Sequence, residues 1–367
     1  MFRTLDVFDT EYSADSVEWC PAEDFQNIFA CGTYQLTEKD EKDNPGPEDD
    51  KKKRIGRIYL FQVTKIDEEP KLSKLQQIEV AAVLDMKWAH VRCLGDRILL
   101  GVVNAAGFLQ IYELTKSSTE APSLSLVSEV SIGEDDGEDR LALSLDWSTG
   151  RRFDLEDQDV EITVSDSGGS ISVLKLGDGG KSLERVHFWK AHEFEAWITA
   201  FDYWDTNVVY SGGDDCKFLR FDTRTGPKPT MTCRVHEAGV TSLHSNWERE
   251  YSLVSGSYDE IVRTWDTRQL RRPLGELSLG GGVWRLKWDP REARLLLAAG
   301  MYNGFFVVDC DIEQSPKLVA EYKEHKSIAY GCDWSFAKRD DKELLLATCS
   351  FYDHALKLSS VELSDDA

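Results

Sequence analysis

Short runs of apolar residues, broken by polar turns, recur along the chain at a regular spacing. In residues 251–268, "YSLVSGSYDEIVRTWDTR", an apolar run meets a polar turn, and a second run then alternates apolar and polar positions up to Trp265. This pattern predicts a β-hairpin. Residues 208–224, "VVYSGGDDCKFLRFDTR", repeat it in register, since Asp259 and Asp215 are 44 positions apart. The chain therefore contains an internal repeat.

Weaker copies of the unit extend the repeat over the rest of the chain. They cover residues 16–63, 81–114, 141–176, 282–309 and 328–358. A repeat of about 40–45 residues that ends in Trp-Asp is typical of the four-stranded blade of a WD-repeat β-propeller. With the two strong copies the units number seven. The sequence thus predicts an all-β fold in which residues 1–367 form one seven-bladed propeller domain.

Three segments lie outside the repeat. Residues 2–12, "FRTLDVFDTEY", have strand character, and we expect them to supply the outer strand of the last blade and so close the ring. Residues 36–54 and 133–139 are rich in charged side chains. We expect these two acidic segments to be solvated, mobile loops, with docking of a partner as the alternative.

Composition narrows the classes of partner and compartment. The net charge of −23 would repel nucleic acid and anionic membranes and attract basic or cationic partners. The longest apolar stretch, at 295–308, is too short to span a bilayer. The eight cysteines form no C-x-x-C pair, and the first residues show no secretory leader. We therefore expect a soluble, cytoplasmic monomer without a structural zinc or another cofactor.

The two strong copies contain histidine, serine and aspartate at matching positions. The sets are His192, Ser211 and Asp215 with Phe221, and His236, Ser255 and Asp259 with Trp265. Such a set suggests a hydrolase triad, but it also matches the buried hydrogen-bonded chain that stabilises a WD blade. Recurrence at one fixed offset favours the structural interpretation, because a scaffold needs the repetition and a catalytic site does not.

The innermost strands of a propeller begin around one mouth of its central channel. The stretches that begin these strands here, and the last hairpin "SFYDHA", combine aromatic and acidic residues, which suits a quaternary ammonium group. Packing of the aromatics between blades is the alternative. The candidate substrate-binding residues are Trp197, Trp284, Arg285, Tyr330 and Tyr352, and the candidate catalytic residues are Glu195, Asp353 and His354.

Several of these stretches are similar to one family. The pieces "AHEFEAWITAFDYW", "GGVWRLKW", "YGCDWS" and "LLATCSFYDHALKL", within about residues 191–358, resemble the WD-repeat methylesterases of diphthamide biosynthesis, also called diphthine methyltransferase. The resemblance implies hydrolysis of the methyl ester of diphthine, a modified histidine of translation elongation factor 2 that carries a trimethylammonium group beside the ester. One departure is Ser359, at a place where a tryptophan would close the last hairpin.

The resemblance supplies no motif for the catalytic residues, so the mechanism is inferred from chemistry. Ester hydrolysis needs a nucleophile, a base and donors for the developing oxyanion. We expect water activated by His354 or Glu195, with Arg285 or backbone amides near the oxyanion. A covalent route through Cys349 or Ser350 is less favoured, because no motif pairs either residue with a base.

Two non-catalytic functions remain as alternatives. The segments "FDTR" and "WDTR" resemble the W-D-x-R signature of substrate receptors for cullin-4 ubiquitin ligases, so Arg224 and Arg268 would contact a ligase adaptor. An acidic scaffold for basic proteins would explain the net charge, but it does not explain the clustered aromatics.

Overall fold

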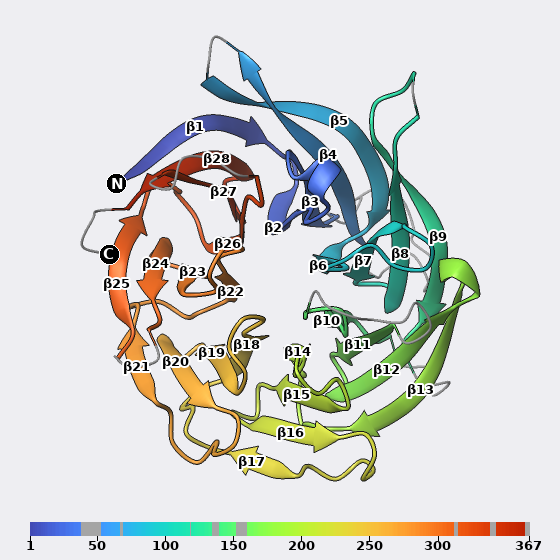
Figure 1. The fold of residues 1–367 in the computed structure, drawn as a ribbon, viewed down its shortest axis with the longest axis vertical. Helices are drawn as coiled ribbons and strands as arrows, with labels where there is room; N and C mark the ends of the chain where they lie inside the picture. Colours follow the sequence, from blue (N-terminus) through green and yellow to red (C-terminus); the bar gives the residue numbers. More distant parts are fainter. Residues whose placement is uncertain are drawn as a thin grey trace, which may run out of the picture.

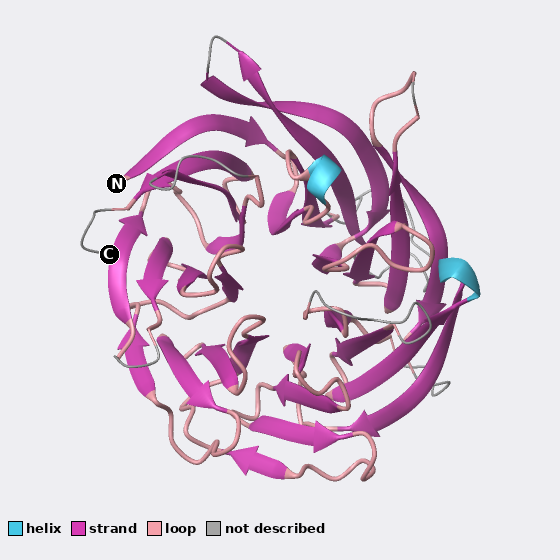
Figure 2. Cartoon of the chain, in the orientation of Figure 1, coloured by secondary structure: helices cyan, strands magenta, loops and turns pink. Residues whose placement is uncertain are grey.

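Seven four-stranded antiparallel sheets stand around a central channel (Figures 1 and 2). The computed structural model describes residues 1–37, 53–66, 69–117, 119–133, 139–151, 160–311, 315–337 and 343–363. Most of both charged segments, 36–54 and 133–139, lies outside the described residues. In the described part of the chain, no helix is long and apolar enough to cross a membrane. The prediction of a seven-bladed all-β propeller is confirmed.

Each of the first four blades is built from four consecutive strands, listed from the channel outward. Blade 1 contains β2 (Ser13–Trp19), β3 (Ile28–Leu36), β4 (Arg54–Ile66) and β5 (Glu69–Ala81). Blade 2 contains β6 (Val83–Trp88), β7 (Ile98–Asn104), β8 (Phe108–Thr115) and β9 (Ser123–Ser131). Blade 3 contains β10 (Ala142–Trp147), β11 (Glu161–Asp166), β12 (Ser170–Gly177) and β13 (Ser182–Lys190). Blade 4 contains β14 (Ile198–Phe201), β15 (Val208–Gly212), β16 (Phe218–Asp222) and β17 (Met231–Cys233).

The remaining blades complete and close the ring. Blade 5 contains β18 (Val240–Ser245), β19 (Ser252–Ser257), β20 (Ile261–Asp266) and β21 (Gly275–Ser278). Blade 6 contains β22 (Arg285–Trp288), β23 (Leu295–Ala299), β24 (Phe305–Asp309) and β25 (Lys317–Tyr322). Blade 7 contains β26 (Ala329–Trp334), β27 (Glu343–Ser350), β28 (Ala355–Glu362) and, outermost, β1 (Phe2–Asp9). The pairing of β1 with β28 closes the ring as predicted and covers the free edge of the last hairpin.

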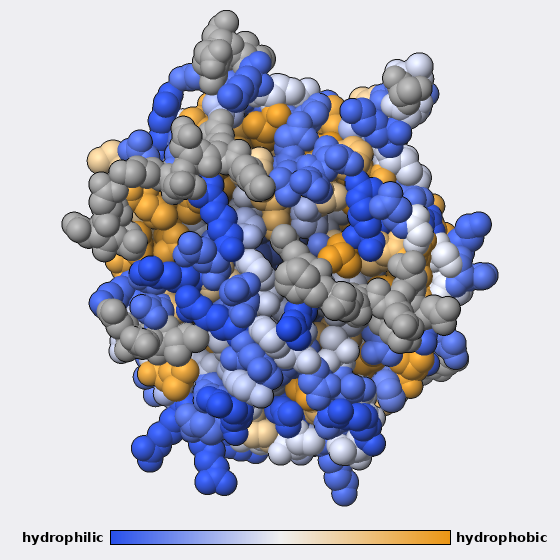
Figure 3. All heavy atoms as spheres, in the orientation of Figure 1, coloured by the Kyte–Doolittle hydropathy of each residue, from blue (hydrophilic) through white to orange (hydrophobic). Residues whose placement is uncertain are grey.

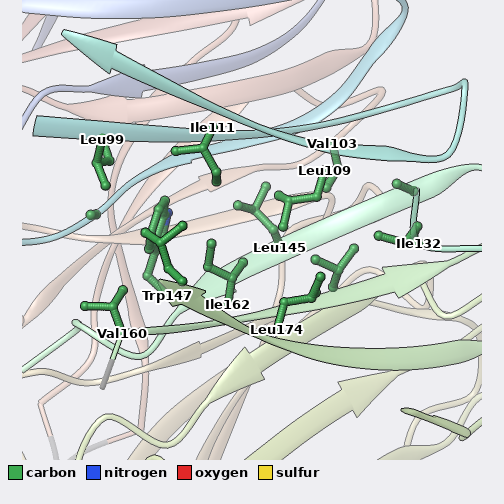
Figure 4. Packing of buried hydrophobic residues seen from close by; sticks show 14 of the residues in the cluster. Leu99, Val103, Leu109, Ile111, Ile132, Leu145, Trp147, Val160, Ile162 and Leu174 are labelled. Carbon is green, nitrogen blue, oxygen red and sulfur yellow. The ribbon is translucent and has the colours of Figure 1, made fainter. Parts of the chain in front are cut away.

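The blades pack face to face through apolar cores. Between blades 2 and 3, for example, Leu99, Ile111, Leu145 and Ile162 pack around the fully buried Trp147 (Figure 4). An inner strand is covered by a blade on each side, so β2 and β10 are buried along their whole length. The outer β13, by contrast, has exposed positions along most of its length. The repeat is therefore easiest to recognise at its inner strands.

The tryptophans that end the inner strands also connect neighbouring blades through hydrogen bonds. The indole N–H groups of Trp88, Trp147, Trp288 and Trp334 each donate to a backbone carbonyl of the preceding blade, at 2.8 to 3.3 Å. Each indole thus buries its ring without leaving its donor unpaired. This fixes the angle between blades and, with it, the positions of the residues that face the channel.

Two short 3-10 helices complete the described structure: η1 (Glu23–Phe25), after β2, and η2 (Asp178–Gly180), between β12 and β13. The inner strands end on the side of the ring where η1 lies, and we call this side the η1 end of the channel. The inner strands begin on the opposite side, which we call the cavity end. Figure 3 views the ring from the η1 end and shows a surface that is mainly hydrophilic around the channel.

Candidate functional site

A cavity of about 470 Å³ opens at the cavity end of the channel. Each blade contributes one residue at an equivalent position to the cavity lining. In five blades this position lies four residues before the tryptophan that ends the inner strand, and in blades 4 and 5 it lies four residues before Phe201 and Ser245, which replace that tryptophan. We call these seven residues the ring residues. In blade order they are Asp15, Leu84, Leu143, Trp197, Thr241, Trp284 and Tyr330.

Local irregularities in the inner strands accompany the ring positions. The strand pairing shifts register at Asp15, Leu84, Leu143 and Thr241, and again across the segment that contains Tyr330. Where one strand of a pair contains an extra residue, a β-bulge forms, and the side chain of that residue no longer follows the alternation between the two faces of the sheet. The other two ring residues, both tryptophans, lie just before β14 and β22 and need no bulge. The backbone thus directs one side chain per blade into the channel.

Aromatic rings form a continuous arc along one side of the cavity. Trp284 lies at the middle of this arc, with ring centroids 5.9 Å from Trp197, 6.0 Å from Tyr258 and 4.7 Å from Tyr330. Phe351 continues it at 5.0 Å from Tyr330. All five line the cavity. Such faces attract a cation that has no hydrogen-bond donors, and they do so most strongly where water is excluded.

The indole N–H groups of the arc differ in their partners. Trp197 donates to Asp214, which lies outside the cavity lining, at 3.0 Å from Nε1 to Oδ1. The Nε1 of Trp284 is buried and finds no acceptor among the described residues. Because an unpaired buried donor is costly, this group is a candidate to donate to a bound ligand.

Asp15 belongs to blade 1, so in ring order it lies between Tyr330 of blade 7 and Leu84 of blade 2. Its side chain is almost completely buried, and its Oδ1 finds no donor among the described residues. Burial raises the pKa of Asp15 well above its usual value; the positive charge of Arg285 opposes this shift, and the negative charge of Asp85 adds to it. A buried carboxyl with a raised pKa in a cavity is typical of a functional group.

Arg285 lines the cavity directly after the ring residue of blade 6. It is buried, and its Nη1 lies 3.1 Å from Asp85 Oδ1. Burial alone would lower the pKa of its guanidinium, but the charges of Asp85, Glu18 and Asp15 outweigh it and keep the group cationic. Asp85 in turn accepts the backbone N–H of Leu145 at 3.2 Å. The guanidinium is thus anchored on one side and faces the cavity on another.

Six of the eight candidate residues from the sequence line the cavity together: Trp197, Trp284, Arg285, Tyr330, Tyr352 and His354. Tyr352 is exposed at the rim, with 69% of its surface accessible. His354 sits in the last hairpin turn with a φ of 52°, and its carbonyl accepts two hydrogen bonds from Thr10.

The other two candidates, Glu195 and Asp353, do not line the cavity. Glu195 is half-buried, and its carbonyl accepts the backbone N–H of Asp214 at 2.9 Å. Asp353 accepts a hydrogen bond from the Ser350 hydroxyl at 2.5 Å and another from the Lys326 backbone at 2.9 Å. Burial would raise the pKa of Asp353, but these hydrogen bonds and the nearby His325 lower it. Its carboxylate therefore holds the hairpin of blade 7.

The histidine, serine and aspartate sets are buried inside the blades. His192 bonds Asp215 and Ser211, each at 2.8 Å, but Ser211 is fully buried and does not line the cavity. In the next blade His236 bonds Ser255 at 2.9 Å, and Ser255 accepts the Trp265 indole at 2.8 Å. These contacts bind strands to one another within a blade.

One member of the second set behaves differently from the prediction. Asp259 pairs with Arg263 Nη1, at 2.8 Å from Oδ2, instead of bonding His236. An arginine on the neighbouring strand offers a charge-assisted bond, which is stronger than a bond to a neutral imidazole.

Blade 7 builds its network from other residues. His325 contacts the hydroxyls of Ser350 at 2.5 Å and Thr348 at 2.8 Å, and Ser350 donates to Asp353. Because the serine stands between the histidine and the aspartate, the order is not that of a catalytic triad. Ser359, at the place where a tryptophan was expected, donates to the Tyr322 hydroxyl at 3.2 Å.

The alternative nucleophiles for a covalent route, Cys349 and Ser350, are both fully buried and do not line the cavity. Burial raises the pKa of the Cys349 thiol well above its usual value, and contact with Cys31 raises it further. A thiol is nucleophilic as its thiolate, so this environment suppresses reactivity.

The W-D-x-R arginines lie at the far ends of their hairpins and hold their own turns. Arg224 contacts Asp222 at 2.8 Å and Asp205 at 2.9 Å. Arg268 contacts Asp266 at 2.6 Å and stacks on Tyr251. Both side chains keep more than half of their surface exposed. Within the described residues, no cluster of three or more metal-ligating side chains is found.

Comparison with known proteins agrees with this architecture. A model of the "WD domain, G-beta repeat" family matches residues 227–266. A chain in the crystal structure of the mitotic checkpoint complex superposes with a TM-score of 0.66, covering 99% of this chain and 95% of that one at 15% identity. That likeness concerns the fold alone.

Sequence relatives are more specific. The diphthine methyltransferases of Mus musculus and Homo sapiens are 42% and 39% identical, over 91% and 90% of this chain and 70% and 74% of theirs. The diphthine methyltransferase homolog of Dictyostelium discoideum is 35% identical over 95% of this chain and 96% of its own length. The chain belongs to the diphthine methyltransferase family. The resemblance inferred from the sequence is thereby confirmed and now extends over nearly the whole chain.

For this diphthine methyltransferase family member, the cavity contains residues that the sequence interpretation did not select, chiefly Asp15, Tyr258 and Phe351. A usable signal existed for Asp15. It precedes Trp19 by the same four residues that separate Trp284 from Trp288, so a comparison of spacing before each inner tryptophan would have found it.

Proposed function

We propose that this protein is a carboxylic ester hydrolase that removes the methyl group from the diphthine methyl ester on translation elongation factor 2, in diphthamide biosynthesis. Membership of the diphthine methyltransferase family supports the substrate class. The cavity offers the two kinds of surface that this substrate requires: aromatic faces for a quaternary ammonium group, and a buried carboxyl beside a guanidinium for the ester.

The observation that carries the proposal is the aromatic arc centred on Trp284. A trimethylammonium group cannot donate hydrogen bonds, so its recognition relies on aromatic faces, each worth up to about 2 kcal/mol when desolvated. The arc supplies faces from four consecutive blades, through Trp197, Tyr258, Trp284 and Tyr330. Arg285 follows Trp284 directly in the chain, so a cation on the arc would place a neighbouring ester next to the guanidinium.

The size and rim of the cavity fit a modified side chain presented by a protein. A volume of about 470 Å³ accommodates a small group rather than a folded segment. Phe194, Tyr302 and Tyr352 are large exposed aromatics, with 57%, 80% and 69% of their surface accessible. They belong to loops at the cavity end. Exposed aromatics around a pocket are typical of a docking surface, and the net charge of −23 would favour a basic partner.

The test is turnover on the protein substrate. Elongation factor 2 bearing the diphthine methyl ester is incubated with catalytic amounts of the purified protein, and the modified peptide is followed by mass spectrometry. We expect loss of the mass of one methylene per substrate and release of methanol in equal amount, with many turnovers. Absence of demethylation by the folded protein would contradict the proposal. Transfer of the methyl group to an acceptor other than water, without methanol, would also contradict it.

A further inference from the structure

Among the seven ring residues, Asp15 is the one carboxylic acid. The others are apolar, aromatic or, at Thr241, a hydroxyl. The chain therefore breaks the chemical pattern of the ring at a single blade. This carboxyl is almost completely withdrawn from water while it still lines the cavity.

Its hydrogen bonding sets Asp15 apart from the buried acids nearby. Asp85 accepts two backbone N–H groups and pairs with Arg285, and Asp333 accepts the backbone N–H groups of Trp19 and Trp334. Asp15 Oδ1, by contrast, has no donor among the described residues. A buried oxygen that gives up water without gaining a donor is costly to keep, so a role for it in binding or catalysis is favoured over a structural one.

We propose that Asp15 is the catalytic base of this site and that Arg285 holds the oxyanion that forms during ester hydrolysis. This inference rests on the proposed function. Both residues line the same cavity and interact electrostatically with each other, and Asp85 Oδ1 anchors the guanidinium at 3.1 Å from its Nη1. The aromatic arc would hold the trimethylammonium group, which leaves the ester carbon facing the gap between the two side chains.

The steps balance as follows. The Asp15 carboxylate removes a proton from water while the water oxygen bonds to the ester carbon, and the carbonyl electron pair moves onto the oxygen that faces Arg285. When this tetrahedral intermediate collapses, the C–O bond to the methoxy group breaks. Protonated Asp15 returns its proton to the departing methoxide, which leaves as methanol. The products are the carboxylic acid, which ionises, and methanol, and Asp15 is again a carboxylate.

The charged and titratable groups that face Asp15 come from four other strands. They are Asp85 on β6, Arg285 on β22, Tyr330 on β26 and Cys349 on β27. Burial and Asp85 together raise the pKa of Asp15, against the effect of Arg285. A carboxylate with a raised pKa is a stronger base but is ionised only at higher pH. The rate should therefore rise with pH through the pKa of Asp15 and level off above it.

The experiment compares Asp15→Asn with wild type in steady-state assays on elongation factor 2 carrying the methyl ester. We expect kcat to fall about 100-fold or more, with little change in KM, and the acidic limb of the pH profile to disappear. Added formate should restore part of the rate to Asp15→Ala by supplying the missing carboxylate. Ser16→Ala is the matched control, since Ser16 is buried next to Asp15, its hydroxyl finds no partner among the described residues, and it does not line the cavity.

The outcomes separate this inference from the proposed function. If wild type does not demethylate, the proposed function fails. If wild type turns over and Asp15→Asn changes only KM, Asp15 is a counter-ion for the ammonium group and the inference is overturned. A second experiment uses wild-type protein alone, so it does not depend on the folding of a variant. It follows a single turnover in ¹⁸O-labelled water. We expect the label in the product carboxylate; label in Asp15 would make it a nucleophile and overturn its assignment as a base.

Discussion

The same seven inner strands form both ends of the central channel, but the two ends differ in whether their buried charged groups are paired. At the η1 end, the residues immediately before the tryptophans form ion pairs: Lys287 contacts Glu18, and Lys87 lies 3.5 Å from Asp146. Tyr203 also donates to Asp146 at 3.2 Å. The cavity lined by Glu18, Lys87, Tyr203 and Lys287 at this end has a volume of only about 70 Å³.

At the cavity end, the ring residues leave about 470 Å³ open, and one oxygen of Asp15 finds no donor in the part of the chain that the structure describes. The repeat supplies the same backbone positions at both ends, so the difference comes from side chains. Paired charges in a filled channel are what a scaffold requires. An unpaired acid in an open cavity costs stability, and is therefore the better indicator of function. Substitutions at the two ends should show this contrast.

The largest effect should follow from Lys287→Met at the η1 end. Lys287 is buried, its ammonium contacts Glu18, and its positive charge also faces Asp333. Its removal leaves buried carboxyl groups without a counter-charge, so we expect a loss of about 3–5 kcal/mol in the free energy of unfolding, measured with urea. The double variant Glu18→Gln and Lys287→Met should recover much of the loss. A single variant as stable as wild type would remove the contrast between the two ends.

The second largest effect should follow from the substitution of His236, a histidine buried inside blade 5. Burial, assisted by the charge of Arg263, lowers the pKa of His236 to about 4. The unfolded chain takes up a proton near pH 6.5 and the folded chain does not, so the contribution of His236 is complete above pH 6.5 and decreases as the pH falls towards 4. We expect the stability advantage of wild type over His236→Gln to shrink by about 2–3 kcal/mol between pH 7 and pH 4. Urea unfolding at each pH measures it, and a gap independent of pH would contradict the assignment.

The fold was accessible from the sequence because the inner strands and turns repeat their chemistry. The tryptophans that link blades, and the turn aspartates such as Asp215, recur at fixed offsets, since each blade solves the same packing problem. The same logic applies to Asp353. It lies in a hairpin turn as Asp215 does, and the structure places it in the corresponding hydrogen-bonded network of its blade. The fixed spacing of the repeat therefore also predicts a structural interpretation of Asp353, beside the catalytic one.

The site was accessible only in part. Trp284 and Tyr330 stand out as aromatics before an inner tryptophan, but the bulges that aim ring residues into the channel leave no mark in the hydrophobic pattern. Glu195 illustrates the limit: it lies only two residues before Trp197, yet it is outside the cavity lining. Asp15 and Asp85 differ in whether their carboxyl oxygens find hydrogen-bond donors. This difference depends on contacts between blades that are distant in sequence.

A third, smaller effect should appear at the aromatic arc. Trp284→Ala removes the ring at the centre of the arc, and with it about 2 kcal/mol of cation recognition, so we expect kcat/KM to fall about 30-fold. Trp284→Phe keeps an aromatic face and should retain most of the activity. Stability should change less than in Lys287→Met, since Trp284 is half-buried at an open cavity. Equal activities of the alanine and phenylalanine variants would show that the ring does not contact the cation.

The smallest effect should come from the arginines that hold the hairpin turns on the outside of the ring. Arg268 is exposed and contacts Asp266 and the Tyr251 ring. Solvent screens such contacts, so Arg268→Ala and Arg224→Ala should leave both the urea midpoint and kcat/KM unchanged within error. The two variants are also a test of the alternative derived from the W-D-x-R pattern. If either one lost the ability to bind a cullin-4 adaptor that wild type retained, while demethylation continued, the outer turns would have a binding role separate from the chemistry of the cavity.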